Sequence, residues 1–144
     1  MKSFIITAII TLASIGQLTL AQNIVNINEN DFINQVWDYK NSPEQFTYKG
    51  DKPCIIDFYA DWCGPCRILG KNLATVADRY KEQIIIYKID IDNPQNAGLA
   101  SFFGIRSIPY ILFIDTQEIN SHTGSLSVEQ LDEIITTRLL NTSK

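Results

Sequence analysis

Residues 54–66 have the sequence Cys-Ile-Ile-Asp-Phe-Tyr-Ala-Asp-Trp-Cys-Gly-Pro-Cys. The nearly continuous apolar run over 54–60 predicts a short strand buried in the middle of a sheet. Pro65 suits the first turn of a helix, where its missing N–H is not needed, and Gly64 lets the backbone bend tightly before it. The stretch therefore predicts a buried strand that turns into a helix, with Cys63 and Cys66 at the start of that helix.

Cysteines in this arrangement can open and close a disulfide without moving the chain. Only a thiolate attacks, and a helix N-terminus lowers the pKa of a thiol from about 8.5 to roughly 3.5–7.5. We expect Cys63 to be the exposed, attacking thiol and Cys66 to be more buried and to resolve the mixed disulfide. The alternative, half of a zinc site, needs a second Cys/His pair. Only Cys54 and His122 remain, so we predict no metal and no other cofactor.

The first 21 residues differ from the rest of the chain. Lys2 is followed by an apolar stretch over 4–15 and by a small residue, Ala21, a pattern typical of a secretory signal peptide. We predict a signal peptide over 1–21, cleavage after Ala21, and a periplasmic or extracellular domain over 22–144. The alternative is an uncleaved N-terminal membrane anchor, but the apolar run is short for a span of about 20 residues.

The composition indicates one globular domain. The chain has 144 residues, is 45% hydrophobic and carries a net charge of −4, which is ordinary for a single domain. No run of basic residues suggests binding to nucleic acid. The third cysteine, Cys54, begins the predicted central strand; a small core residue is the better interpretation, and a regulatory thiol is the alternative.

Hydrophobic periodicity and capping signals predict the element order β-α-β-α-β-α-β-β-α. Strands are predicted over 24–27, 54–60, 84–90 and 110–114, and a weaker strand ends near Gly124. Four helices are predicted: one begins at Asn30 or Asp31, one directly after the cysteine motif, one at Asn93-Pro94, and one at the capping box 127–130. The first helix is predicted to carry Phe32, Ile33, Val36 and Trp37 on one face, and the third to carry Leu99, Phe102 and Phe103. Residues 38–53 are predicted as an extended loop. This order implies an α/β fold with a central mixed sheet flanked by helices on both faces.

With these elements in place, the chain resembles the thioredoxin family over roughly residues 25–140. The matching segments are Lys52-Pro53, Asp57-Phe58-Tyr59-Ala60, Trp62-Cys63-Gly64-Pro65-Cys66, Lys88-Ile89-Asp90, Gly104-Ile105-Arg106-Ser107-Ile108-Pro109 and Gly124. The resemblance implies the thioredoxin fold and a protein-disulfide reductase whose redox-active disulfide is Cys63–Cys66. Trp62, Gly64 and Pro65 would complete its active-site loop.

The resemblance also assigns roles to a carboxylate and a lysine. Asp57 would lie behind the disulfide, with a pKa raised by desolvation, and would transfer the proton of Cys66. The alternative is an aspartate that faces solvent at a strand edge. Lys88 would be the buried partner that tunes Asp57, and its alternative is a solvated lysine on an edge strand.

A client-binding surface is implied as well. Ile108-Pro109 matches the cis-proline loop of the family, in which the backbone before the proline pairs with the extended chain of the substrate. Trp62 and Gly124 would border this surface, whereas a tryptophan packed in the core is the alternative for Trp62. Lys71, after Gly70, replaces a helix-kinking proline of many thioredoxins, and Tyr59 stands where tryptophan is common.

Together these features predict an exported thiol–disulfide oxidoreductase that reduces or isomerises disulfides. Its partners would be disulfide-containing client proteins and an upstream electron donor such as a membrane thiol transporter, and we expect it to act as a monomer. An oxidase and a thiol reductase of cytochrome c maturation are enzymatic alternatives. A non-catalytic binding or chaperone module is an alternative of another class, and the intact Cys63 and Cys66 argue against it.

Overall fold

A five-stranded sheet forms the centre of the molecule. The structure is a computed structural model that describes residues 23–140, so the signal peptide predicted over 1–21 lies outside the described residues. The strands are β1 (Ile24–Asn26), β2 (Cys54–Tyr59), β3 (Ile85–Asp90), β4 (Tyr110–Ile114) and β5 (Ile119–Thr123). Their order is β1-β3-β2-β4-β5. β1, β3 and β2 run parallel, and β4 and β5 add antiparallel pairs, so the predicted mixed sheet is confirmed.

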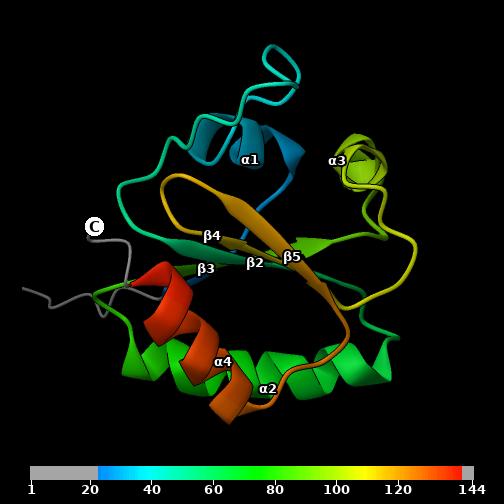
Figure 1. Ribbon diagram of the computed structural model, residues 1–144. Helices are drawn as coiled ribbons and strands as arrows, with labels where there is room; N and C mark the ends of the chain where they lie inside the picture. Colours follow the sequence, from blue (N-terminus) through cyan, green and yellow to red (C-terminus); the bar gives the residue numbers. More distant parts are fainter. Residues whose placement is uncertain (1–22, 141–144) are drawn as a thin grey trace, which may run out of the picture.

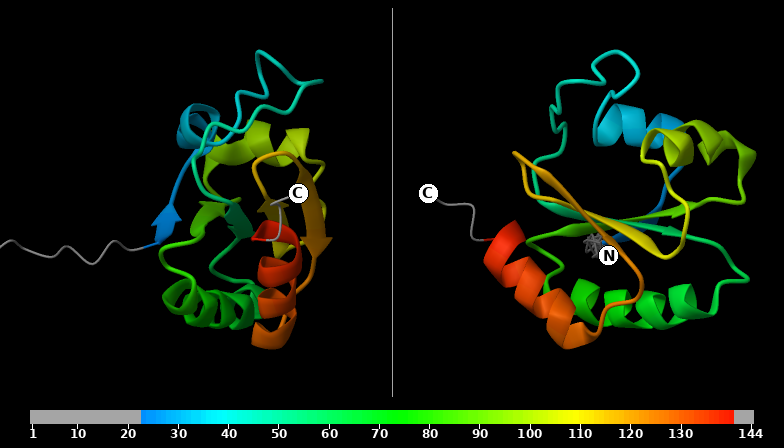
Figure 2. Two further views of the ribbon diagram at one scale, coloured as in Figure 1. Left: turned by 60° about the vertical axis from the view of Figure 1, so that its left-hand side comes forward. Right: turned by 45° about the vertical axis from the view of Figure 1, so that its right-hand side comes forward.

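The helices lie in two layers, one on each face of the sheet. They are α1 (Glu29–Gln35), α2 (Gly64–Arg79), α3 (Ala97–Phe102), which follows a 3-10 turn (Pro94–Asn96), and α4 (Val128–Ile134), which continues into a π-helical turn (Ile135–Leu139). α1 and α3 cover one face, and α2 and α4 cover the other (Figures 1 and 2). Within residues 23–140, no helix is both long and apolar enough to span a membrane.

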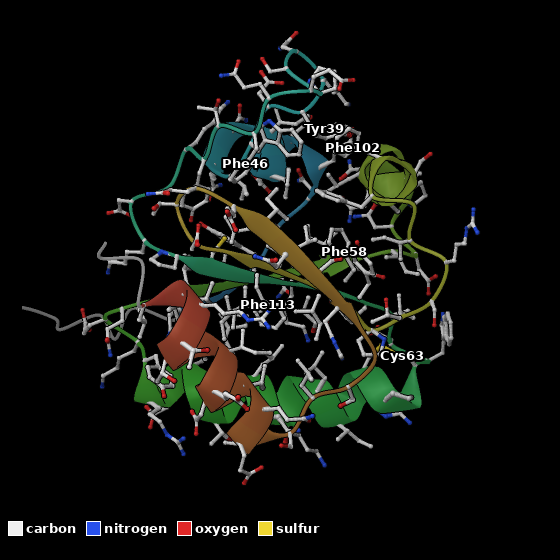
Figure 3. All side chains as sticks on the ribbon, viewed as in Figure 1. Tyr39, Phe46, Phe58, Cys63, Phe102 and Phe113 are labelled. Carbon is white, nitrogen blue, oxygen red and sulfur yellow. A yellow bond between two sulfur atoms is a disulfide. The ribbon has the colours of Figure 1, made fainter. Side chains whose placement is uncertain are left out.

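Side chains of β2 alternate between two hydrophobic cores. Phe58 belongs to the core under α1 and α3, and Ile55 belongs to the core over α2 and α4. Figure 3 shows Phe58 above the sheet and Phe113 below it. Because both faces of the sheet are covered, its central strands are apolar along nearly their whole length, as the run over 54–60 predicted.

The predicted start of α1 at Asn30 or Asp31 is wrong. Asn28 caps the helix: its side chain accepts the N–H of Asp31 at 3.0 Å, and the Asp31 carboxylate accepts the N–H of Asn28 at 3.0 Å. Asp31 is therefore the third residue of a capping box rather than the cap itself. The helix ends at Gln35, so Val36 and Trp37 contribute to the core from the chain that follows it.

Phe102, one of the three apolar residues predicted on the third helix, is 38% exposed. The helix predicted from Asn93 begins as the 3-10 turn, and only Leu99 of α3 is fully buried. Phe102 lies on the outside of that layer, where its ring packs on Tyr39 with a centroid distance of 4.3 Å. The end of the helix at Gly104 is confirmed by its positive φ of 60°.

Candidate active site

The first turn of α2 holds the disulfide. Cys63 is the N-cap of this helix, and Cys66 lies within its first turn. The two sulfurs are bonded to each other, and the backbone N–H of Cys66 donates to the Cys63 sulfur at 3.2 Å. The Cys63 sulfur thus lies at the positive end of a 16-residue helix, where unpaired N–H groups stabilise a thiolate.

The expectation that Cys63 is exposed is wrong for the disulfide form. Cys63 is 4% exposed and Cys66 is 3% exposed, so burial does not distinguish them. The reason is a loop far away in the sequence: the carbonyl oxygen of Ile108 lies 3.9 Å from the Cys63 sulfur. What distinguishes Cys63 is its position, because it caps the helix and faces this loop, whereas Cys66 is inside the helix. Figure 3 shows Cys63 at the edge of the fold where α2 begins.

The loop over the disulfide has the predicted geometry. The Ile108–Pro109 peptide bond is cis. The carbonyl of Pro109 accepts the backbone N–H of Gly124 at 2.9 Å, which joins the start of β4 to the end of β5. Gly124 has a φ of 104°, a conformation that favours glycine. The structure therefore brings together the three residues predicted to bind the client.

Trp62 is 69% exposed, so its alternative interpretation as a core residue is wrong. Its indole N–H donates to the carboxylate of Asp92 at 2.7 Å, a partner that the sequence did not suggest. Beside Trp62 lies a pocket of about 330 Å³; its other lining residues are Ile91, Ile105, Arg106, Ser107 and Ile108. This groove is open to solvent next to the disulfide.

Asp57 is fully buried in β2, which excludes the solvent-facing alternative. Burial raises its pKa from an ordinary 3.8 to about 6, and the positive charge of Lys88 opposes that rise. Neither carboxylate oxygen has a hydrogen-bond partner among the described residues. The Lys88 ammonium is the nearby charge, with its nitrogen 3.8 Å from Asp57 Oδ2.

Lys88 lies on an interior strand, so its alternative as an edge-strand lysine is wrong. Its strand, β3, pairs with β1 on one side and β2 on the other, and Lys88 stands opposite Asp57 in the register. The ammonium lies 4.1 Å from the centre of the Tyr59 ring, within range of a cation–π interaction. The contact between Tyr59 and Lys88 was not predicted from the sequence.

Cys54 is an inert core thiol in this fold. It is fully buried, and burial raises its pKa to about 12, so it has little thiolate at neutral pH. This supports the core interpretation over a regulatory thiol. Within residues 23–140, no group of three or more His, Cys, Asp or Glu side chains has an arrangement that could hold a metal ion.

A disulfide at a helix N-terminus, a cis-proline loop over it and a buried carboxyl group on a central strand define a thiol–disulfide oxidoreductase. Comparison with known proteins narrows this class. The thioredoxin family model matches residues 23–137. The chain is 43% identical to thioredoxin of Borreliella burgdorferi over 90 residues, which are 62% of this chain and 74% of the relative. It is 45% identical to thioredoxin of Chlorobaculum thiosulfatiphilum over 90 residues, 59% of this chain and 82% of that one.

Solved structures agree with these sequence matches. The chain is similar to chloroplastic thioredoxin z, with a TM-score of 0.63 and 26% identity, over 78% of this chain and 91% of the other. The chain belongs to the thioredoxin family. It is a thiol–disulfide oxidoreductase, with protein-disulfide reductase activity carried by its Cys-Gly-Pro-Cys pair.

Proposed function

We propose that Cys63 is the nucleophile and Cys66 the resolving thiol of this reductase. The observation that carries the assignment is the backbone N–H of Cys66 directed at the Cys63 sulfur, 3.2 Å away at the start of α2. The Cys63 thiolate attacks a client disulfide, forms a mixed disulfide and releases one client thiolate. Cys66 then attacks the Cys63 sulfur, the bond to the client breaks, and its electron pair leaves with the second client sulfur. Two electrons pass to the client, and the Cys63–Cys66 disulfide forms.

Asp57 is proposed as the group that accepts the proton of Cys66 during the second attack. Its pKa of about 6 suits a base that acts near neutral pH. Lys88, at 3.8 Å, keeps that pKa from rising further and so keeps the carboxylate available. The proton then serves to protonate a departing client thiolate or passes to water.

The client is proposed to bind as an extended segment along the Ile108–Pro109 loop. The Ile108 carbonyl lies beside the Cys63 sulfur and is placed to accept a backbone N–H from the client, as in strand addition. Gly124 holds the loop through its N–H, and the exposed Trp62 forms a second wall. A client side chain next to its disulfide would enter the groove beside Trp62.

The protein is further proposed to work outside the cytoplasm, as a monomer, on exported client proteins. The support is the sequence of residues 1–21, with Lys2, an apolar stretch and Ala21 at the end. In an oxidising compartment a reductant needs a supply of electrons, so we propose an upstream donor such as a membrane thiol transporter. Expression in a bacterial host with N-terminal sequencing of the product tests this: a start at Gln22 is expected, and retention of Met1 in a membrane fraction would favour the anchor.

The roles of the cysteines are tested by insulin reduction with dithiothreitol as the electron source. Cys63→Ser is expected to abolish turnover, because no nucleophile remains. Cys66→Ser should accumulate mixed disulfides with insulin, which mass spectrometry detects. Cys54→Ala, which removes the buried third thiol, is the matched control and should retain turnover. Full activity of the Cys63→Ser variant would refute the mechanism, and the reduction potential of the pair would separate a reductant from an oxidase.

A further inference from the structure

An aromatic pocket lies on the face of the sheet that α1 and α3 cover. It has a volume of about 490 Å³, and its lining comes from the chain after α1, the end of α3 and the turn between β4 and β5. The lining includes Trp37, Glu44, Phe46, Phe102, Phe103 and Glu118. Figure 3 shows Phe46 and Phe102 on this side of the sheet and Cys63 at the start of α2. None of these lining residues has a role in the sulfur chemistry.

Aromatic rings gather around Trp37 in this pocket. The rings of Phe46 and Phe102 stand at 87° and 71° to the ring of Trp37, with centroid distances of 5.4 and 5.3 Å. Phe102 is exposed to solvent, whereas Trp37 is buried beneath the surface. The faces of aromatic rings attract positive charge, and tryptophan does so most strongly. The rings therefore offer a cation a site that is partly shielded from water.

Hydrogen bonds hold two sides of the pocket in place. The indole N–H of Trp37 donates to the carbonyl of Gln45 at 3.1 Å, which fixes the loop after α1. On the other side, the carboxylate of Asp115 accepts the backbone N–H groups of Gln117 and Glu118, each at 2.8 Å. The pocket is thus formed before a ligand arrives, which lowers the entropic cost of binding.

The charges in the lining are negative. Glu44 and Glu118 are exposed, and no described residue of the lining is a lysine, an arginine or a histidine. Within residues 23–140, neither carboxylate belongs to an ion pair. Two lysines of the loop are engaged elsewhere: Lys40 pairs with Glu29, and the Lys49 ammonium donates to a backbone carbonyl of α1 at 2.7 Å. The pocket is therefore complementary to a cation.

A guanidinium group suits this lining better than other cations. It is planar and weakly hydrated, stacks on aromatic rings, and donates N–H groups to carboxylates. A primary ammonium is more strongly hydrated, and a quaternary ammonium has no N–H group to donate to Glu44 or Glu118. An arginine side chain can use the rings and the carboxylates at the same time.

The position of the pocket indicates where such an arginine comes from. Phe103 lines the aromatic pocket, and Ile105, two residues later, lines the groove beside Trp62. Two residues span at most about 7 Å, so the pocket adjoins the groove proposed for the client. Contacts of exposed rings and exposed carboxylates with a cation are weak, so a free guanidinium compound should bind only at millimolar concentration. A client that already lies in the groove presents its arginine at a high effective concentration.

We propose that this aromatic pocket binds an arginine side chain of the client and so favours clients that carry an arginine near the reacting disulfide. This preference rests on the proposed function, in which the client lies in the groove beside Trp62. The pocket takes no part in bond exchange between sulfurs. The arginine increases the share of client that is bound, so it should lower KM and leave kcat unchanged.

Reduction of peptide disulfides tests the preference. Each peptide carries one arginine at a chosen distance from its disulfide, and a matched peptide carries citrulline, which has nearly the same shape without the charge. At the spacing that reaches the pocket, kcat/KM should be about fivefold higher for the arginine peptide, as expected for a partly exposed cation–π contact. The difference should shrink at high salt, which screens the carboxylates.

Three variants show whether the pocket causes the difference. Phe102→Leu keeps an apolar side chain without the ring, and Glu118→Gln removes one negative charge, so the ratio between the two peptides should fall toward one in both. Glu82→Gln removes an exposed carboxylate outside the pocket and should keep the ratio of the wild type. A ratio that survives Phe102→Leu and Glu118→Gln would contradict the proposal, as would equal kcat/KM values of the wild type at every spacing. If the wild type reduces neither peptide, the proposed function itself is wrong.

Binding is measured apart from reduction by NMR of the Trp37 indole N–H. A peptide with one arginine and no cysteine should shift this signal at millimolar concentration, and its citrulline counterpart should not. The chain has two tryptophans, and Trp62→Phe identifies the signal of Trp37. No shift with the arginine peptide would overturn the proposal. A larger shift with a trimethyllysine peptide would also overturn it, because the pocket would then prefer a quaternary ammonium.

Discussion

Asp57 is a carboxyl group on which two influences act in opposite directions. Burial raises its pKa to about 6, and the positive charge of Lys88 reduces the rise without cancelling it. The separation of 3.8 Å between Lys88 Nζ and Asp57 Oδ2 is too long for a hydrogen bond. The carboxyl group can therefore gain and lose a proton close to neutral pH, as transfer from a thiol requires.

This pKa makes the free energy of unfolding depend on pH. Between about pH 4 and pH 6 the folded protein holds a proton on Asp57 that the unfolded chain has lost, because the ordinary pKa is 3.8. The stability contributed by the protonated carboxyl is thus complete below pH 4 and lost as the pH rises through 6. Asp57→Asn has no such titration. Its stability relative to the wild type should grow by about 2–3 kcal/mol from pH 4 to pH 8.

Urea unfolding of both oxidised proteins at the two pH values measures that difference. Other titrating groups are common to both proteins and cancel in the comparison. A difference that stays constant from pH 4 to pH 8 would mean that Asp57 does not change its charge in this interval. The assignment of Asp57 as a base near neutral pH would then be untenable.

The reactive residues were predicted from the sequence more accurately than the environment around them. The motif 62–66 follows a buried strand, so the helix start and the disulfide were evident from local pattern. The burial of Cys63 was not, because the Ile108 carbonyl that covers it comes from 45 residues later in the chain. The hydrogen bond from Trp62 to Asp92 crosses 30 residues and left no local signal. Lys88 was predicted as the partner of Asp57 from the family resemblance, and the register of β2 and β3 places the two residues opposite each other. The prediction that it is buried is wrong, because its side chain is 23% exposed.

At the scale of elements, a buried glutamate joins α1 to α3. The Glu29 carboxylate accepts the Tyr39 hydroxyl at 3.0 Å and the Leu99 backbone N–H at 3.1 Å, and it pairs with Lys40. Burial alone would raise its pKa, but these hydrogen bonds and the positive charge lower it on balance. Glu29 therefore stays ionised at neutral pH and holds the two helices against the same face of the sheet.

Glu29→Gln should weaken this connection. The amide keeps the size of the side chain but offers one acceptor oxygen to three donors and adds N–H groups that have no acceptor. We expect a loss of about 1–3 kcal/mol in the free energy of unfolding at neutral pH. The loss should shrink below about pH 4, because a lowered pKa contributes stability that disappears as the carboxylate is protonated. Urea unfolding measures this loss of stability. Glu44→Gln, on the exposed loop, is the control. Equal losses for the two variants would contradict the role of Glu29 in joining α1 to α3.

Local capping signals in the sequence mark the starts of both α1 and α4, although only the signal of α4 was predicted correctly. The capping box of Ser127 and Gln130 was predicted and is present. Asn28 and Asp31 have the same spacing and form the same reciprocal hydrogen bonds, so the sequence held a signal for the true start of α1. The contact between Glu29 and Leu99 spans 70 residues. Only the assembled fold brings α3 to this carboxylate, and no local pattern reveals it.

The whole molecule consists of two cores that share one sheet. Cys54 lies in the core under α1 and α3, and its neighbour in sequence, Ile55, lies in the core over α2 and α4. Since each core uses alternate residues of the same strands, neither layer of helices can leave without exposing side chains of β2. The topology was predictable because strongly apolar strands alternate with helical patterns, and the same arrangement implies that both cores unfold together.

Cys54 can report this coupling, since it is the one free thiol when Cys63 and Cys66 are oxidised. Leu131 of α4 is fully buried in the opposite core, so Leu131→Ala should cost about 2–5 kcal/mol. If the fold opens as one unit, Cys54 should react with a thiol reagent about a hundredfold faster in this variant, because each 1.4 kcal/mol is tenfold in the open population. Ile68→Ala, which alters a side chain 59% exposed on α2, should leave the rate unchanged. The contrary outcome is a Leu131→Ala variant whose fluorescence shows lower stability but whose Cys54 reacts as slowly as in the wild type. That result would show that the two layers open separately. The sheet would then stay covered on the side of α1 and α3 when α4 detaches.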